Sequence, residues 1–140
     1  MQHKETKQIE QLYDPSWTAV FMLIGFSMIF IARMLRPLPA DAHPIIVFIV
    51  GVMPNFGAGL AIPFFILVLN DAFFKKQLWQ PAMQFNVICL FTLLGLAAWE
   101  LAHTLAWGVP FDWFDMLATI AGIACAYIAF HTLIFCKNQF

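Results

Sequence analysis

The chain has 140 residues, of which 62% are hydrophobic and 11% are charged, and its formal net charge is −1. Soluble domains are on average about 25% charged and about 45–50% apolar, so this composition excludes a soluble globular domain and a disordered chain. Without a basic excess there is no surface that neutralises phosphates, so we expect no nucleic-acid partner.

Four long apolar segments follow a short polar segment. Residues 1–16 are polar and lack the apolar stretch of a signal peptide. Within them, Asp14-Pro15-Ser16 marks a helix start, because proline suits the first turn of a helix. The apolar segments cover about residues 17–34, 44–69, 85–107 and 114–136, and residues 137–140 form a short tail.

Each apolar segment has about the 20 residues that a helix needs to cross the hydrocarbon core of a membrane. Lipid offers no hydrogen-bond partner to a backbone amide, so a segment exposed to lipid must satisfy its own backbone as a helix. We therefore predict an all-α integral membrane protein, in which residues 17–136 form a single domain of four transmembrane helices in a compact bundle.

The second apolar segment contains Pro54 and Pro63, with glycines beside them. Proline removes a backbone donor and clashes with the preceding turn, so we predict a kink at these positions. Asn55 lies near the middle of the membrane, where its side-chain amide needs a polar partner. Two interpretations follow: either the backbone of a neighbouring helix supplies that partner, or Asn55 lines a functional cavity.

The distribution of basic residues predicts an orientation. The side that holds both termini has Lys4, Lys7, Lys75, Lys76 and Lys137, and the opposite side has Arg33 and Arg36. Lysine and arginine are more frequent in cytoplasmic loops. We therefore expect a protein of the bacterial cytoplasmic membrane with both termini in the cytoplasm.

Glu100 is the first candidate site residue. It lies about seven residues from the end of the third segment, which places it about 10 Å deep at 1.5 Å per residue. A carboxylate inside a membrane helix is costly and therefore points to function. Glu100 is either protonated or paired with a cation. The candidate cations are His103, which shares its helix face, and Arg33 or Arg36 from the first helix.

Polar residues at the start of the fourth segment form the rest of the candidate site. Asp112 is well placed as the N-cap, with Asp115 in the first turn. Thr119 continues the face of Asp115. We predict that Glu100, His103, Asp115, Thr119 and Asn55 converge in the outer half of the bundle. They form either a ligand or proton site, or a charge network that only fixes helix packing.

Catalysis and metal binding have little support in the sequence. Glu100-x-x-His103 is half of a di-metal carboxylate site, but only one copy is present, so we expect no metal and no cofactor. No nucleophile accompanies a base, and no catalytic or phosphate-binding motif is found. An intramembrane enzyme that uses Glu100, His103 and Asp115 for acid–base chemistry therefore ranks below a non-enzymatic protein.

Two stretches, 53–65 (MPNFGAGLAIPFF) and 99–122 (WELAHTLAWGVPFDWFDMLATIAG), resemble the VanZ-like family of small membrane proteins. Asn55 and Pro63 match one helix of that family, and Glu100 matches its membrane glutamate. Asp112, Asp115 and Gly122 match the later element.

The stretches also depart from the family pattern. His103 replaces a glutamine, Thr119 replaces an asparagine, and the loop arginine of the family is missing. The resemblance implies four helices and a membrane-embedded acidic site, without specifying a reaction.

These observations favour a VanZ-like membrane protein with an outer-facing polar pocket that binds a lipid or a lipid-linked cell-envelope ligand. Glu100 and His103 would hold the polar head, and aromatic side chains would hold the apolar part. The alternatives are a small subunit or assembly partner of a larger membrane complex, and a proton-coupled transporter or channel formed by a homo-oligomer. The expected partners are accordingly membrane lipid, further copies of the chain or a larger complex.

Overall fold

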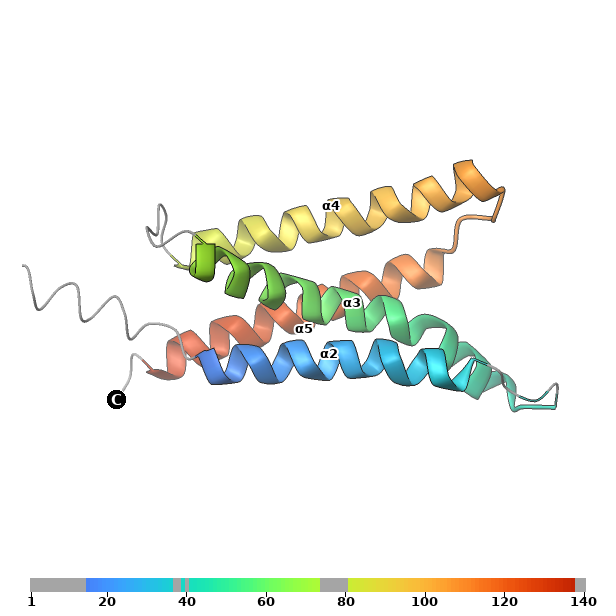
Figure 1. The fold of residues 1–140 in the computed structure, drawn as a ribbon, viewed down its shortest axis with the longest axis horizontal. Helices are drawn as coiled ribbons and strands as arrows, with labels where there is room; N and C mark the ends of the chain where they lie inside the picture. Colours follow the sequence, from blue (N-terminus) through green and yellow to red (C-terminus); the bar gives the residue numbers. More distant parts are fainter. Residues whose placement is uncertain (1–14, 37–38, 40, 74–80, 138–140) are drawn as a thin grey trace, which may run out of the picture.

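The computed structural model describes residues 15–36, 39, 41–73 and 81–137, and these residues form four long α-helices joined by short connections (Figure 1). The helices are α2 (Pro15–Leu35), α3 (Pro44–Phe73), α4 (Pro81–Trp107) and α5 (Trp113–Lys137). Each contains a stretch long and apolar enough to cross a membrane. The prediction of an all-α protein with four transmembrane helices packed together is thus confirmed. Most of the predicted polar segment 1–16 and tail 137–140 lies outside the described residues.

Proline defines where three of the helices begin. α2, α3 and α4 start at Pro15, Pro44 and Pro81. The first residues of a helix have no acceptor for their backbone N–H, so a residue without that donor loses nothing there. The start that was predicted at Asp14-Pro15-Ser16 is confirmed by α2.

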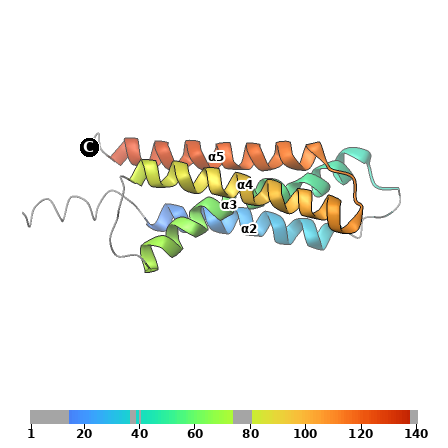
Figure 2. The same cartoon turned by 90° about the horizontal axis from the view of Figure 1, so that it is seen from above.

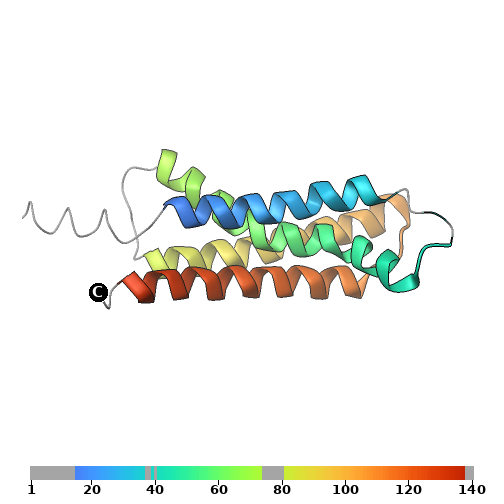
Figure 3. The ribbon, with the colours of Figure 1, turned by 90° about the horizontal axis from the view of Figure 1, so that it is seen from below.

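The helices run alongside one another, with α3 against both α2 and α5 (Figures 2 and 3). The C-terminal ends of α2 and α4 and the N-terminal ends of α3 and α5 lie together, and we call this the loop end (Figure 2). α4 makes fewer contacts with α3 and α5 than α3 makes with α2 and α5. In Figure 1, α4 diverges from the other helices toward the loop end.

Glycines permit the close packing of α3. A Cβ on Gly25 of α2 would lie 2.6 Å from the carbonyl oxygen of Gly57 in α3. On the other side of α3, a Cβ on Gly59 would meet the carbonyl oxygen of Thr119, and one on Gly122 of α5 would meet that of Phe56. Membrane helices associate through such close backbone contact, because lipid is as apolar as their side chains. α3 is therefore fixed between α2 and α5 by small residues on two faces.

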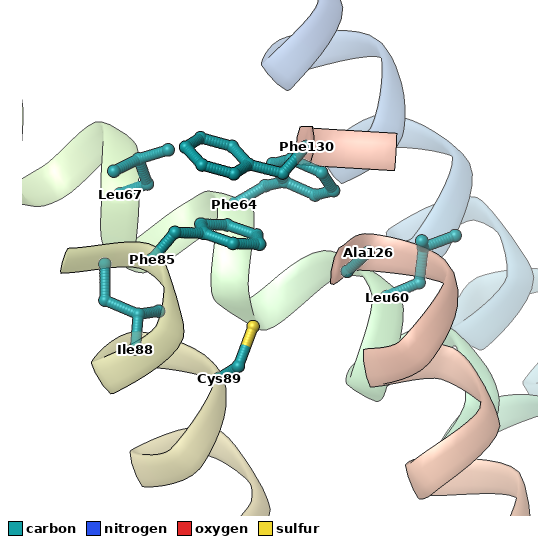
Figure 4. Close-up of a cluster of buried hydrophobic side chains, with 8 residues drawn as sticks. All are labelled: Leu60, Phe64, Leu67, Phe85, Ile88, Cys89, Ala126 and Phe130. Atoms are coloured by element: carbon teal, nitrogen blue, oxygen red, sulfur yellow. The ribbon is translucent and has the colours of Figure 1, made fainter. Parts of the chain in front are cut away.

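A row of aromatic rings joins all four helices at the end opposite the loop end. Phe64 of α3 contacts Phe21 of α2 with ring centroids 5.4 Å apart, and contacts Phe85 of α4 at 5.3 Å. Phe85 in turn stacks on Phe130 of α5 at 3.9 Å. Phe64, Phe85 and Phe130 belong to the main buried cluster (Figure 4). This cluster is what holds α4 to the bundle.

The helix α3 is continuous from Pro44 to Phe73, through both internal prolines. Pro63 is fully buried and Pro54 is half-buried. The kink expected at these prolines stays a prediction.

Candidate functional site

The inner face of α4 changes character along its length. Near its start, Phe85, Ile88, Cys89 and Thr92 are buried. The same face continues, at helical spacing, to Leu96, Glu100 and His103, which are only half-buried. α4 therefore closes the bundle at one end and leaves its polar inner residues partly accessible toward the loop end.

A hydrogen bond between two helices lies at the centre of the site. The side chain of Asn55 in α3 bonds to the carboxyl group of Asp115 in α5. Asp115 also interacts electrostatically with Glu100 of α4, with Asp112, and with Arg36 just after α2. We call Asn55, Glu100, Asp115 and Arg36 the loop-end cluster, and it receives a residue from each of four chain segments.

The charge around Asp115 is unbalanced. Two carboxylates, Glu100 and Asp112, act on Asp115 as like charges, whereas Arg36 is the attractive charge. Asn55 partly compensates, because its amide can donate to the Asp115 carboxylate. Asp115 and Glu100 lie within stretches that can cross a membrane. A net negative charge there is costly unless a proton or a cation neutralises it.

His103 is placed between two tryptophans of its own helix. Its ring centroid lies 4.5 Å from that of Trp99 and 4.8 Å from that of Trp107. The Glu100 carboxylate acts electrostatically on Asp115 of α5. The backbone carbonyl of Glu100 accepts a hydrogen bond from the Thr104 hydroxyl at 3.3 Å. His103 thus lies beside the loop-end cluster, in an aromatic setting.

Asp112 caps α5, as predicted. Its carboxylate accepts a hydrogen bond from the backbone N–H of Phe114 at 2.8 Å, and its carbonyl oxygen accepts one from Met116. Both bonds satisfy donors of the first turn. Asp112 is therefore occupied in ending the loop before α5, and its effect on Asp115 is electrostatic.

Two of the predicted residues lie away from the centre of the cluster. Thr119, one turn further along α5 than Asp115, is 3% exposed and lies at the close contact with Gly59. Arg33 is exposed near the end of α2. The structure thus brings Asn55, Glu100 and Asp115 together, with Arg36 nearby, and places Thr119 in the packing between α3 and α5.

Sequence reasoning missed three features of this region. Trp99 and Trp107, which lie four residues before and after His103, were not considered as its ring partners. Thr92 was not considered, although its hydroxyl is buried and, among the described residues, is one of the few polar side-chain atoms without a hydrogen-bond partner. Helical spacing from Glu100 and His103 gives the signal that identifies all three.

The described residues contain no group of three or more His, Cys, Asp or Glu side chains placed to hold a metal ion. The carboxylates of the loop-end cluster are near enough to influence one another without converging on a single point. The cluster can therefore hold a distributed polar group or a proton.

Fold and site together define a class of protein: an integral membrane protein of four α-helices with a polar cluster between them at one end. No family model, curated protein or solved structure matches the chain.

Proposed function

We propose that this protein binds the polar head of a membrane lipid, or of a lipid-linked cell-envelope molecule, in the loop-end cluster. The observation that carries the proposal is the Asn55–Asp115 hydrogen bond between α3 and α5, with Glu100 of α4 within electrostatic range. Three helices contribute polar side chains to this cluster, and these side chains are only half-buried. A purely structural network would be expected to exclude solvent and to balance its charges.

The surroundings of the cluster suit the apolar part of such a ligand. Trp99 and Trp107 on α4 are more than half exposed in the bundle. Phe48 of α3 meets Phe114 of α5 edge to face, with ring centroids 5.4 Å apart. An amphipathic molecule entering from the bilayer would thus meet aromatic side chains beside the polar groups. The resemblance to VanZ-like proteins agrees with a membrane-embedded acidic site.

The proposed orientation places this site on the outer side of the bacterial cytoplasmic membrane, with both termini in the cytoplasm. The lysines and arginines of the sequence support it. The site would then face the compartment in which cell-envelope molecules are assembled.

Native mass spectrometry of the protein, extracted gently from its own membrane, tests the proposal. We expect a defined extra mass of lipid size on the wild-type protein, reduced in Glu100→Gln and Asp115→Asn. Asp41→Asn is the matched control, because it also removes a carboxylate at the loop end, from an exposed residue. Equal adducts on all four proteins would contradict a headgroup site in the cluster.

The same experiment distinguishes the alternatives. A foreign protein chain in fixed ratio would make this a subunit or assembly partner of a larger complex. A homo-oligomer without adduct would favour a proton-coupled transporter or channel, in which Glu100 carries the proton. Proton flux into liposomes that Glu100→Gln abolishes would then establish that function.

A further inference from the structure

We propose that His43 is a pH-sensitive N-cap of α3, which holds the start of this helix when its ring is neutral and releases it when the ring is protonated. The Nδ1 atom of His43 accepts a hydrogen bond from the backbone N–H of Ile45 at 3.3 Å. The carbonyl oxygen of His43 accepts bonds from the N–H groups of Ile46 and Val47 at 2.9 and 3.2 Å. These are the bonds of an N-cap residue, and Pro44 fills the first helical position after it. Serine, threonine, aspartate and asparagine are the usual residues at an N-cap, so a histidine there is unusual.

The side-chain bond of His43 requires a neutral ring. A neutral imidazole has one nitrogen that can accept a hydrogen bond, whereas both nitrogens of the protonated ring are donors. Protonation also places a positive charge at the positive end of the helix dipole. Because the capped state needs the neutral ring, it binds fewer protons at His43 than the uncapped state, and capping weakens as the pH falls. Histidine ordinarily changes charge between about pH 5 and 8.

The helix α5 begins at the same end of the bundle with a cap of a different chemistry. The Asp112 carboxylate accepts the N–H of Phe114, two residues further on, at 2.8 Å, just as Nδ1 of His43 accepts the N–H of Ile45. A carboxylate ordinarily remains an acceptor between about pH 5 and 8. The two helix starts therefore differ in the one property that the proposal invokes, and α5 serves as an internal control.

The start of α3 has little packing that could replace its cap. Residues 45–49 are all large and apolar, and each is at least 47% exposed in the bundle. α3 also begins further out at the loop end than α5 does (Figure 3). A helix end with few tertiary contacts opens most easily and depends on local bonds. Release of the cap therefore loosens the first turn of α3 and, through Phe48, its edge-to-face contact with Phe114 of α5. In the proposed orientation, this change would follow the pH on the outer side of the membrane.

The other charged and titratable groups at the loop end determine which controls are needed. Within the part of the chain that the structure describes, they are Arg33 of α2, Arg36 just after it, Asp41 in the connection, Glu100 and His103 of α4, and Asp112 and Asp115 at the start of α5. His103 is the other histidine at this end, and Glu100 and Asp115 interact electrostatically with each other. A pH response that arose from any of these groups would survive the replacement of His43.

Hydrogen–deuterium exchange of the full chain in lipid nanodiscs tests the proposal, with rates corrected for the intrinsic effect of pH. We compare about pH 8 with about pH 5, the limits of the range in which histidine titrates. The protection of the amides of residues 45–48 should fall about fivefold at the lower pH, which corresponds to the loss of one N-cap. The amides of residues 114–116, at the start of α5, should keep their protection. Equal protection of residues 45–48 at both pH values would overturn the proposal.

Two variants of His43, which is exposed and needs no repacking, assign the response. His43→Asn provides a favoured N-cap that does not titrate, so we expect high protection of residues 45–48 at both pH values. His43→Ala removes the cap and should give low protection at both. His103→Gln is the matched control and should respond to pH as the wild type does. Persistence of the response in His43→Asn, or its loss in His103→Gln, would assign it to another group and overturn the proposal.

Discussion

At the scale of single residues, the pairing of Asn55 with Asp115 explains how two polar side chains are accommodated between apolar membrane helices. Each side chain alone would be a polar group in an apolar setting, and each supplies the partner that the other needs. The pair also fixes the Asp115 carboxyl group relative to α3. Among the described residues, the Glu100 carboxylate makes no hydrogen bond to another helix, which agrees with the ligand contact that we propose for it.

The first prediction concerns the strength of this pair. A double-mutant cycle with Asn55→Ala and Asp115→Ala should give a coupling energy of about 0.6 kcal/mol and at most about 1.7 kcal/mol, the average and the maximum measured for hydrogen bonds between membrane helices. Reversible unfolding in mixed micelles measures it. A parallel cycle with Asn86→Ala, an exposed amide on α4, should give no coupling with Asp115. A coupling near zero for Asn55 would mean that the pair does not hold α3 to α5.

Several of these residues could be found from sequence, and the reason is physical. A carboxylate or amide within an apolar helix needs a polar partner, so the sequence alone indicates Asn55, Glu100 and Asp115 as candidate site residues. Their actual partners depend on which helix faces meet, and periodicity does not fix the rotation of one helix against another. Thr119 was predicted in the site for this reason, whereas the structure buries it at the α3–α5 contact.

At the scale of elements, the position of α3 depends on glycines that face two different helices. Gly57 meets α2, while Gly59, two residues later, meets α5. Two residues turn a helix by about 200°, so these glycines point to nearly opposite sides. The sequence showed small residues that permit close packing, but not which neighbour each one meets.

The second prediction tests these contacts with a matched pair of substitutions. Gly122→Ala should destabilise the bundle by about 1–3 kcal/mol, because the new methyl group meets the backbone of Phe56 and cannot be relieved by a rotamer change. Gly95→Ala has open space around it and should leave stability unchanged or raise it by up to about 1 kcal/mol. Unfolding in mixed micelles measures both variants. Equal effects would mean that α3 and α5 are not in backbone contact.

The third prediction concerns the aromatic row that holds α4. Phe85 is fully buried between Phe64 and Phe130, so Phe85→Ala should cost about 3 kcal/mol through the cavity that it leaves. Phe91 of the same helix is 66% exposed and would face lipid. The control variant Phe91→Ala should change the free energy of unfolding by much less. Similar losses in the two variants would place α4 in a different rotation.

At the scale of the whole molecule, packing and polarity are separated along the bundle. The buried hydrophobic cluster lies at one end, and the loop-end cluster lies toward the other. The number and length of the helices followed from hydropathy alone, because the thickness of the bilayer sets them. The unequal packing of α4 could not be predicted from hydropathy, because it depends on side-chain contacts between helices that are distant in sequence.

The fourth prediction follows from this separation and uses two threonines of α4. In a chain whose own cysteines are replaced by serine, Thr104→Cys should react with a water-soluble maleimide, because the inner face of α4 is only half-buried there. Thr92→Cys should not react, because that position is 4% exposed within the packed half. The two substitutions are identical in chemistry and lie on one helix, so a difference reports the packing of α4 alone. Labelling of both positions at one rate would mean that α4 packs evenly along its length, without a packed half and a more accessible half.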